Sequence, residues 1–125
     1  MLVLHAGFFF AAAGFLAVGA HALWPSQIPY AVGVHVWAMG AIGVMTLAMM
    51  TRATLGHSGR ALVASKGTLF AYLCVSAALL ARIAMAFLPD FALPLMHVAA
   101  AAWLLAFAAF LFVYGPMLVR RGGPA

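Results

Sequence analysis

Five histidines are the residues of this chain whose chemistry stands out. The sequence has a single acidic residue, Asp90, and the following histidines: His5, His21, His35, His57 and His97. Neutral imidazole is a common ligand of iron, copper and zinc. Ionisable residues inside a membrane are costly, so those that occur there mark candidate functional positions. The histidines are therefore the first candidates for a metal or cofactor site.

The composition indicates that a lipid bilayer surrounds these residues. Of the 125 residues, 69% are hydrophobic and 6% are charged, whereas soluble domains are about 45–50% apolar and about 25% charged. The six basic residues fall in short breaks between apolar runs, which is typical of membrane topology rather than of a nucleic-acid-binding face. The one cysteine, Cys74, lies in an apolar run and is interpreted as a small buried residue.

Four apolar segments are long enough to cross the membrane as helices. Crossing about 30 Å of hydrocarbon takes roughly 20 residues, and the backbone must satisfy its own hydrogen bonds there. The sequence therefore predicts one domain over residues 1–125, an all-α integral membrane protein with a bundle of four transmembrane helices. The expected helices are Leu2–Trp24, Tyr30–Thr51, Leu62–Leu88 and Phe91–Leu118.

The basic residues predict the orientation. Four crossings return the chain to the side on which it starts, and that side holds Arg52, Arg60, Lys66, Arg120 and Arg121. The loops of the opposite side carry only Asp90. By the positive-inside rule, both termini should be cytoplasmic, in the inner membrane of a bacterium.

Counting helical rise places three histidines at one depth. At 1.5 Å per residue, His21, His35 and His97 lie roughly 5, 7 and 9 Å inside the membrane on the Asp90 side. Two such imidazoles on facing helices could bind a heme b axially, and three could bind copper. His5 and His57 belong to the opposite side, where they form a possible second metal pair.

Other residues at this depth could complete such a site. Arg82 also lies roughly 9 Å inside the Asp90 side, and it needs a partner such as Asp90, a carbonyl or the propionates of a heme. The thioethers of Met39 and Met96 could bind a soft metal. Gly33, Gly40 and Gly43 form a flat stripe on which a macrocycle or a neighbouring helix could pack.

The sequence offers little for other chemistry. One acid cannot form a carboxylate pair for acid–base work, and no Ser-His-Asp triad can be assembled. A proton-coupled transporter would favour an acid within a span, whereas Asp90 lies in a loop. No catalytic residue is predicted.

Several segments resemble one known family. The most specific is "HVWAMGAIGVMTLAMMTRATLGHSGRAL", residues 35–62, and it resembles a distinctive segment of the NnrS family. "LHAGFFF", "ARIAMAFLP" and "AAAAWLLAFAAFLFVYGPMLVRRGG" resemble further family segments, so the resemblance covers nearly the whole chain. It implies a membrane protein that contains heme and copper and acts in the nitric-oxide response or in denitrification.

The resemblance also bears on the candidate residues. Six of them fall on family motif positions: His5, His35, Arg52, His57, Arg60 and Arg82. Family members have many more helices, and this chain resembles their C-terminal four, so self-association or a partner membrane subunit could complete a site.

The sequence supports three hypotheses about function. The leading hypothesis is heme or copper binding, with His35 and His97 as the axial pair, His21 as a further ligand and Arg82 facing propionates. One alternative is an interaction subunit that packs on a membrane partner through the glycine stripe. The other is a small transporter or quinone-site protein.

Overall fold

The computed structural model describes residues 2–119, and every regular element in this range is helical. The elements are α1 (Leu2–Leu23), α2 (Tyr30–His35), the π-helix η1 (Val36–Gly43), α3 (Val44–His57), α4 (Lys66–Phe87), the short 3₁₀ helix η2 (Pro89–Phe91) and α5 (Ala92–Val119). Within this range four helices are long and apolar enough to cross a membrane, which confirms the predicted number. Arg120 and Arg121, used in predicting the orientation, lie outside the described residues.

One of the four spans is built from three elements. α2, η1 and α3 follow one another without a break and form a single helix of 28 residues, Tyr30–His57, here called the composite helix. Its middle section makes the wider turns of a π-helix directly after His35. π-helical turns are rare and often occur at functional sites.

Two helix ends differ from the predicted ones by more than one residue, because local caps set them. The composite helix continues past Thr51 to His57, where the Gly59 amide bonds to the Gly56 carbonyl at 3.2 Å and the Arg60 amide to the Leu55 carbonyl at 3.0 Å. Gly59 adopts a φ of 65°, so the end is a Schellman motif.

α4 begins at Lys66 rather than at the predicted Leu62. The Ser65 hydroxyl accepts a hydrogen bond from the Thr68 amide at 3.2 Å, as an N-cap does. Residues 60–65 are therefore an irregular connection, although most of them are apolar.

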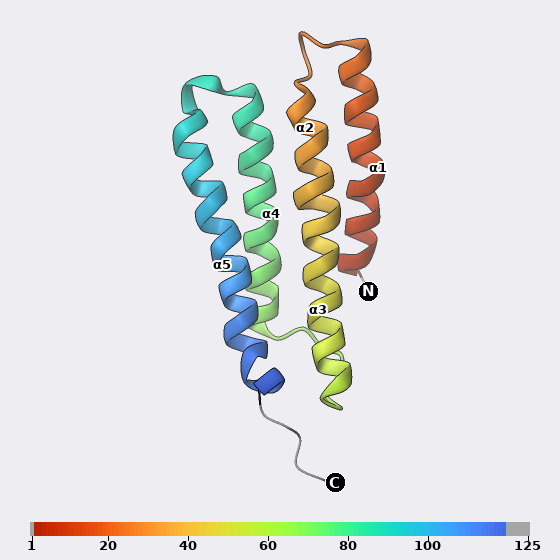
Figure 1. Ribbon diagram of the computed structural model, residues 1–125, viewed down its shortest axis with the longest axis vertical. Helices are drawn as coiled ribbons and strands as arrows, with labels where there is room; N and C mark the ends of the chain where they lie inside the picture. The colour runs from red at the N-terminus through yellow and green to blue at the C-terminus, as the bar shows by residue number, and fades with distance from the viewer. Residues whose placement is uncertain (1, 120–125) are drawn as a thin grey trace.

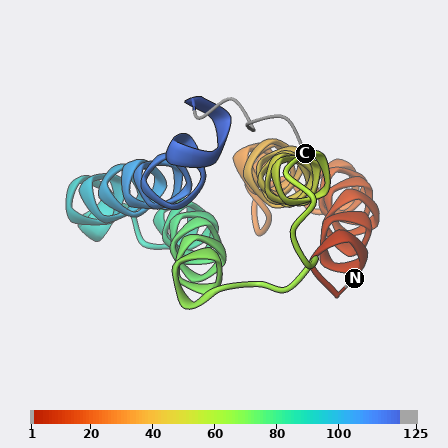
Figure 2. The ribbon, with the colours of Figure 1, turned by 90° about the horizontal axis from the view of Figure 1, so that it is seen from below.

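The spans form a zigzag row rather than a closed square. Seen end-on, the order is α5, α4, the composite helix and α1 (Figure 2). Within residues 2–119, no Cα atom of α1 lies within 8 Å of a Cα atom in α4 or α5. α5 approaches α3 but comes within that distance of neither α2 nor η1. The row is thus closed near one end of α5 and open near the other (Figure 1).

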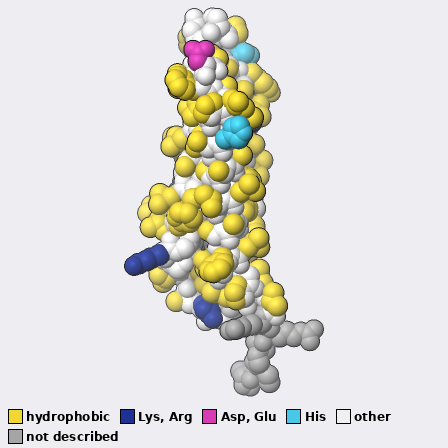
Figure 3. Space-filling view, turned by 90° about the vertical axis from the view of Figure 1, so that its left-hand side faces the viewer, with side chains coloured by type: hydrophobic (Ala, Val, Ile, Leu, Met, Phe, Trp, Pro, Cys, Tyr) yellow, Lys and Arg dark blue, Asp and Glu magenta, His cyan; other side chains and the backbone are white. Residues whose placement is uncertain are grey.

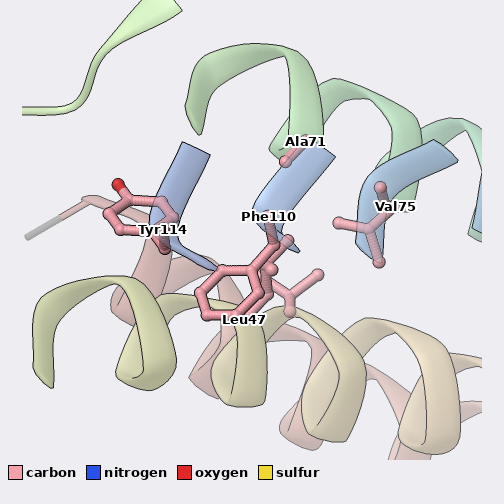
Figure 4. Packing of buried hydrophobic residues seen from close by; sticks show 7 residues of the cluster. Leu47, Ala71, Val75, Phe110 and Tyr114 are labelled. Carbon is pink, nitrogen blue, oxygen red and sulfur yellow. The ribbon is translucent and has the colours of Figure 1, made fainter. Parts of the chain in front are cut away.

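The apolar core lies between α3, α4 and α5. Leu47, Val75 and Tyr114 are almost completely buried there, and Phe110 stacks on Tyr114 with the ring centroids 5.1 Å apart (Figure 4). Two hydroxyl pairs border this core: Thr51 with Tyr72 at 2.7 Å and Thr68 with Tyr114 at 2.6 Å. These bonds join neighbouring helices, as polar side chains often do in membrane proteins.

α1 packs closely on the composite helix through glycines. A Cβ atom at Gly14 would overlap the Trp37 ring, and one at Gly33 would lie 2.5 Å from Val18. Trp37 also donates its indole N–H to the Ala11 carbonyl at 3.0 Å. The small residues let the two backbones approach, as is typical of helix pairs in membranes.

The surface is apolar along its length and carries charge near its ends (Figure 3). The acidic side chain lies toward one end, here called the Asp90 end, and the basic side chains in this view lie toward the other, here called the Lys66 end. Both ends of the described chain lie toward the Lys66 end (Figure 1).

Candidate metal and cofactor site

An open groove lies in the half of the protein toward the Asp90 end. It has a volume of about 450 Å³, within the range of about 300–1,000 Å³ common for ligand pockets. The composite helix, α4 and α5 line it, with the residues Met39, Arg82, Met96, Ala99, Ala100, Trp103 and Leu104. It exists because α5 diverges from α2 and η1 in this half.

His35 stands beside the groove and is held by two hydrogen bonds. Its Nδ1 lies 2.6 Å from the Ala31 carbonyl oxygen, and its Nε2 lies 3.1 Å from Nε of Arg82. A carbonyl can only accept, so Nδ1 carries the proton and donates. Arg82 can only donate, so the Nε2 lone pair accepts. His35 is therefore a neutral imidazole whose metal-binding lone pair points at a guanidinium.

Arg82 joins His35 to the groove. Its Nε donates to His35, and its Nη1 contacts the sulfur of Met85 at 3.8 Å. In the described part of the chain, the partners of Arg82 are thus His35 and Met85, whereas the sequence suggested Asp90. Because Arg82 lines the groove while holding His35, a ligand in the groove that attracted the guanidinium would change the contacts of His35.

The other two histidines of the predicted level face elsewhere. His21 lies in the last turn of α1 and has Nδ1 2.7 Å from the Ile28 carbonyl oxygen, across the turn that follows. His97 is exposed on α5, with Nδ1 2.8 Å from the Leu93 carbonyl oxygen. Its neighbour Met96 lines the groove, and His97 does not.

A site of three histidines is not assembled. Residues 2–119 include all five histidines, yet this range holds no group of three or more His, Cys, Asp or Glu side chains that could hold a metal ion. Equal depth did not bring His21, His35 and His97 together, because their helices stand in a row and turn them in different directions.

At the Lys66 end, His5 and His57 are both exposed. His57 has Nδ1 2.8 Å from the Ala53 carbonyl oxygen. In His21, His35, His57 and His97 alike, Nδ1 bonds a backbone carbonyl, which leaves Nε2 as the nitrogen with the lone pair. Second-shell bonds of this kind fix the tautomer of metal-binding histidines.

The predicted glycine stripe is covered by side chains of this chain. Gly33 faces Val18, Gly40 faces Phe10 and Leu79, and Gly43 faces Trp103. All three glycines are buried. They therefore serve packing between these helices, and the prediction that their face meets a partner protein is wrong. Gly43 still matters for the groove, because it makes room for Trp103, one of the lining residues.

The model of a family described as "NnrS protein" matches residues 1–121 of the chain. The chain belongs to the NnrS family. No curated protein and no solved structure matches it.

In this NnrS-family chain the sequence could have revealed the contact between His35 and Arg82. Depth counting puts both at nearly one level, and an arginine inside a membrane needs an acceptor. The hydroxyl pairs were also missed, although Thr68 and Tyr72 are four residues apart and so lie on one face of α4. Polar residues at this spacing in an apolar helix are a usable signal.

Proposed function

We propose that this NnrS-family protein binds heme b or copper in the bacterial inner membrane and acts in the nitric-oxide response or in denitrification. The observation that carries the proposal is the groove of about 450 Å³ with the neutral imidazole of His35 at its side and Arg82 between them. The family membership supports the same function.

The residues around the groove fit a heme better than a bare copper ion. A bare cation would be repelled by the guanidinium of Arg82, whereas the carboxylates of a heme would attract it. If the guanidinium moves to a carboxylate, the lone pair of His35 becomes available to a metal. The walls contributed by Ala99, Ala100 and Trp103 are apolar, as suits a macrocycle.

In this proposal each residue has a distinct role. His35 is the protein ligand, Arg82 binds the propionates, and Met39 and Met96 supply thioethers that would also suit copper(I). His97 lies next to the groove-lining Met96 and remains the proposed second axial ligand, with His21 as a further ligand and His5 with His57 as a second pair. A bound heme would supply an iron that can bind nitric oxide.

The orientation is part of the proposal. Arg52, Arg60 and Lys66 all lie toward the Lys66 end, so the positive-inside rule places that end in the cytoplasm. The groove would then open in the periplasmic half of the membrane.

The test is a spectrum of the protein purified in detergent, with iron and copper analysis. A Soret band with stoichiometric iron is expected, and His35→Ala should abolish or shift the band. Arg60→Ala removes a polar side chain at the other end, outside the proposed ligands, and is the control, which should leave the band unchanged. Protein with neither a Soret band nor copper would refute the proposal.

A second function, as a subunit of a larger membrane assembly, has its own support. In the most apolar window of each span, 11% of residues are buried in α1 and 17% in α5, against 50% in the composite helix. Two such exposed spans at the edges of the row could each pack on another copy or on a partner subunit. Crosslinking in native membranes, followed by gel analysis, would detect such an assembly.

A further inference from the structure

A second groove, at the Lys66 end, lies apart from the groove that carries the proposed function. It has a volume of about 360 Å³ and lies between α3 and the connection that follows it, lined by Met49, Arg52, Ala53, Gly56, His57 and Leu62. One guanidinium and one imidazole thus stand beside apolar side chains. The groove is open above Gly56, where an added Cβ atom would meet no atom within 4 Å.

The length of the composite helix places this groove at the membrane surface. Its 28 residues extend about 42 Å, whereas the hydrocarbon core is about 30 Å thick. If Tyr30 marks one boundary, roughly 20 residues bring the helix to the other boundary near Met50. Arg52 and His57 then stand at the level of the lipid phosphates, and Met49 stands at the start of the acyl chains.

The charges around the groove favour an anion. Arg52 and His57 line it, and Arg60 and Lys66 follow within the next residues of the chain. The single acidic residue, Asp90, lies toward the opposite end (Figure 3). The carbonyls at the end of α3 repel an anion, but the Schellman bonds of Gly59 and Arg60 already occupy two of them.

Apolar walls next to a cationic rim match one kind of anion best. A free phosphate would gain nothing from Met49 or Leu62, whereas a phospholipid places its phosphate at the rim and its glycerol and acyl carbons on the walls. Basic pockets beside helix ends in a membrane are known to hold anionic lipid headgroups.

We propose that this groove is a binding site for an anionic phospholipid, with Arg52 contacting the phosphate. Its guanidinium presents five N–H donors and can therefore bond a phosphate while keeping another contact. His57 already donates Nδ1–H to the Ala53 carbonyl, so Nε2 is the nitrogen available to the lipid.

The experiment measures lipid binding by native mass spectrometry of the full chain in detergent. Phosphatidylglycerol is titrated against the wild type, Arg52→Gln and Arg60→Gln. The two variants lose the same charge, but only Arg52 lines the groove. Arg52→Gln should weaken binding by about tenfold, as the loss of one charge-assisted hydrogen bond does, and Arg60→Gln should weaken it much less. An equal loss in both variants would overturn the proposal, because it would indicate a general charge effect.

A second variant keeps the test valid if Arg52→Gln misfolds. Gly56→Leu fills the groove without changing charge, and open space at this position means that no atom is displaced. It should weaken phosphatidylglycerol binding by a similar factor while thermal unfolding stays unchanged. Wild-type binding of Gly56→Leu would overturn the proposal.

Two further arms identify the source of the anion. Phosphatidylcholine should bind far more weakly than phosphatidylglycerol, and inorganic phosphate at millimolar concentration should not displace the lipid. Equal binding of phosphatidylcholine, or displacement by phosphate, would overturn the assignment to an anionic lipid. Neither the variants nor the measurement involves the groove at the Asp90 end, so the result is independent of heme or copper binding.

Discussion

At the scale of residues, the arginine and the histidine beside the groove depend on each other. Arg82 has found an acceptor in the lone pair of His35 at 3.1 Å, which satisfies a guanidinium that would otherwise be costly in a membrane. The same bond occupies the Nε2 lone pair of His35, the one that a metal would need. Any ligand that takes His35 must therefore give Arg82 another partner.

The first prediction separates heme from copper by opposite changes in affinity. Arg82→Ala should weaken hemin binding by about tenfold or more, because a charge-assisted hydrogen bond to a propionate is lost. The same change should strengthen copper(I) binding, because it removes a nearby cation and uncovers the lone pair of His35. Absorbance titration with hemin and competition with a copper(I) chelator measure the two affinities. If both affinities change in the same direction, Arg82 does not have the role assigned here.

The sequence could predict the depth of these residues but not their direction. Counting 1.5 Å per residue put His21, His35, His97 and Arg82 at one level. Which of them meet depends on the rotation of each helix about its axis, and an apolar helix surrounded by lipid has no polar face to reveal it. For this reason the sequence could place Arg82 and His97 at one expected level but could not show that Arg82 contacts His35.

At the scale of elements, the pairing of α1 with the composite helix depends on glycines that leave no space. A Cβ atom at Gly14 would overlap Trp37, whereas one at Gly19, on the same helix, would meet no atom within 4 Å. The two positions therefore form a natural comparison of a packed and an unpacked face.

The second prediction compares substitutions at Gly14 and Gly19. Gly14→Leu should lower the free energy of unfolding by about 1–3 kcal/mol or more, because it forces the helices apart. Gly19→Leu should leave stability unchanged or slightly raised, since leucine favours a helix more than glycine does. Thermal unfolding in one detergent, followed by circular dichroism, measures both. Similar losses in the two variants would show that α1 packs in another way.

The spans were predictable because hydropathy and length identify them directly. Their ends were less predictable, because polar caps set them within a few residues. Thr51 was taken as the end of its helix, yet its hydroxyl bonds the Ala48 carbonyl at 2.9 Å and the helix continues. The sequence contains no signal that predicts the π-helix, since its residues suit an α-helix equally well.

At the scale of the whole molecule, the order of the helices in the row determines how much of each helix is covered by its neighbours. The composite helix and α4 lie inside the row, and α1 and α5 lie at its edges (Figure 2). The sequence could not predict this order, because faces toward lipid and faces toward protein are both apolar in this chain. The outer helices leave a larger share of their residues exposed to lipid or further protein than the inner ones do.

The third prediction concerns orientation across the membrane. In a Cys74→Ala background, Ser26→Cys lies in the loop between α1 and α2, and Ser58→Cys lies just after α3. An impermeant thiol reagent added to intact cells should label the first from the periplasm and leave the second unlabelled until the membrane is opened. Both serines are exposed, so labelling depends on sidedness. The reverse pattern would show that the Lys66 end faces outward.

The π-helix Val36–Gly43 changes the rotation about the helix axis between the two halves of the composite helix. Val32, before it, and Val36, its first residue, pack with Leu79; after it, Val44 and Leu47 join the core that includes Phe110. Its wider turns alter the angle at which the second half emerges. If the segment became α-helical at the same length, everything from Val44 onward would be rotated relative to the first half, because each α-helical residue turns the chain by about 100° and each residue of the wider π-helix turns it by less. Thr51 would then face away from Tyr72, and the two ends of the protein would no longer fit the same neighbours. The length of this short segment therefore sets the register between the groove at the Asp90 end and the groove at the Lys66 end.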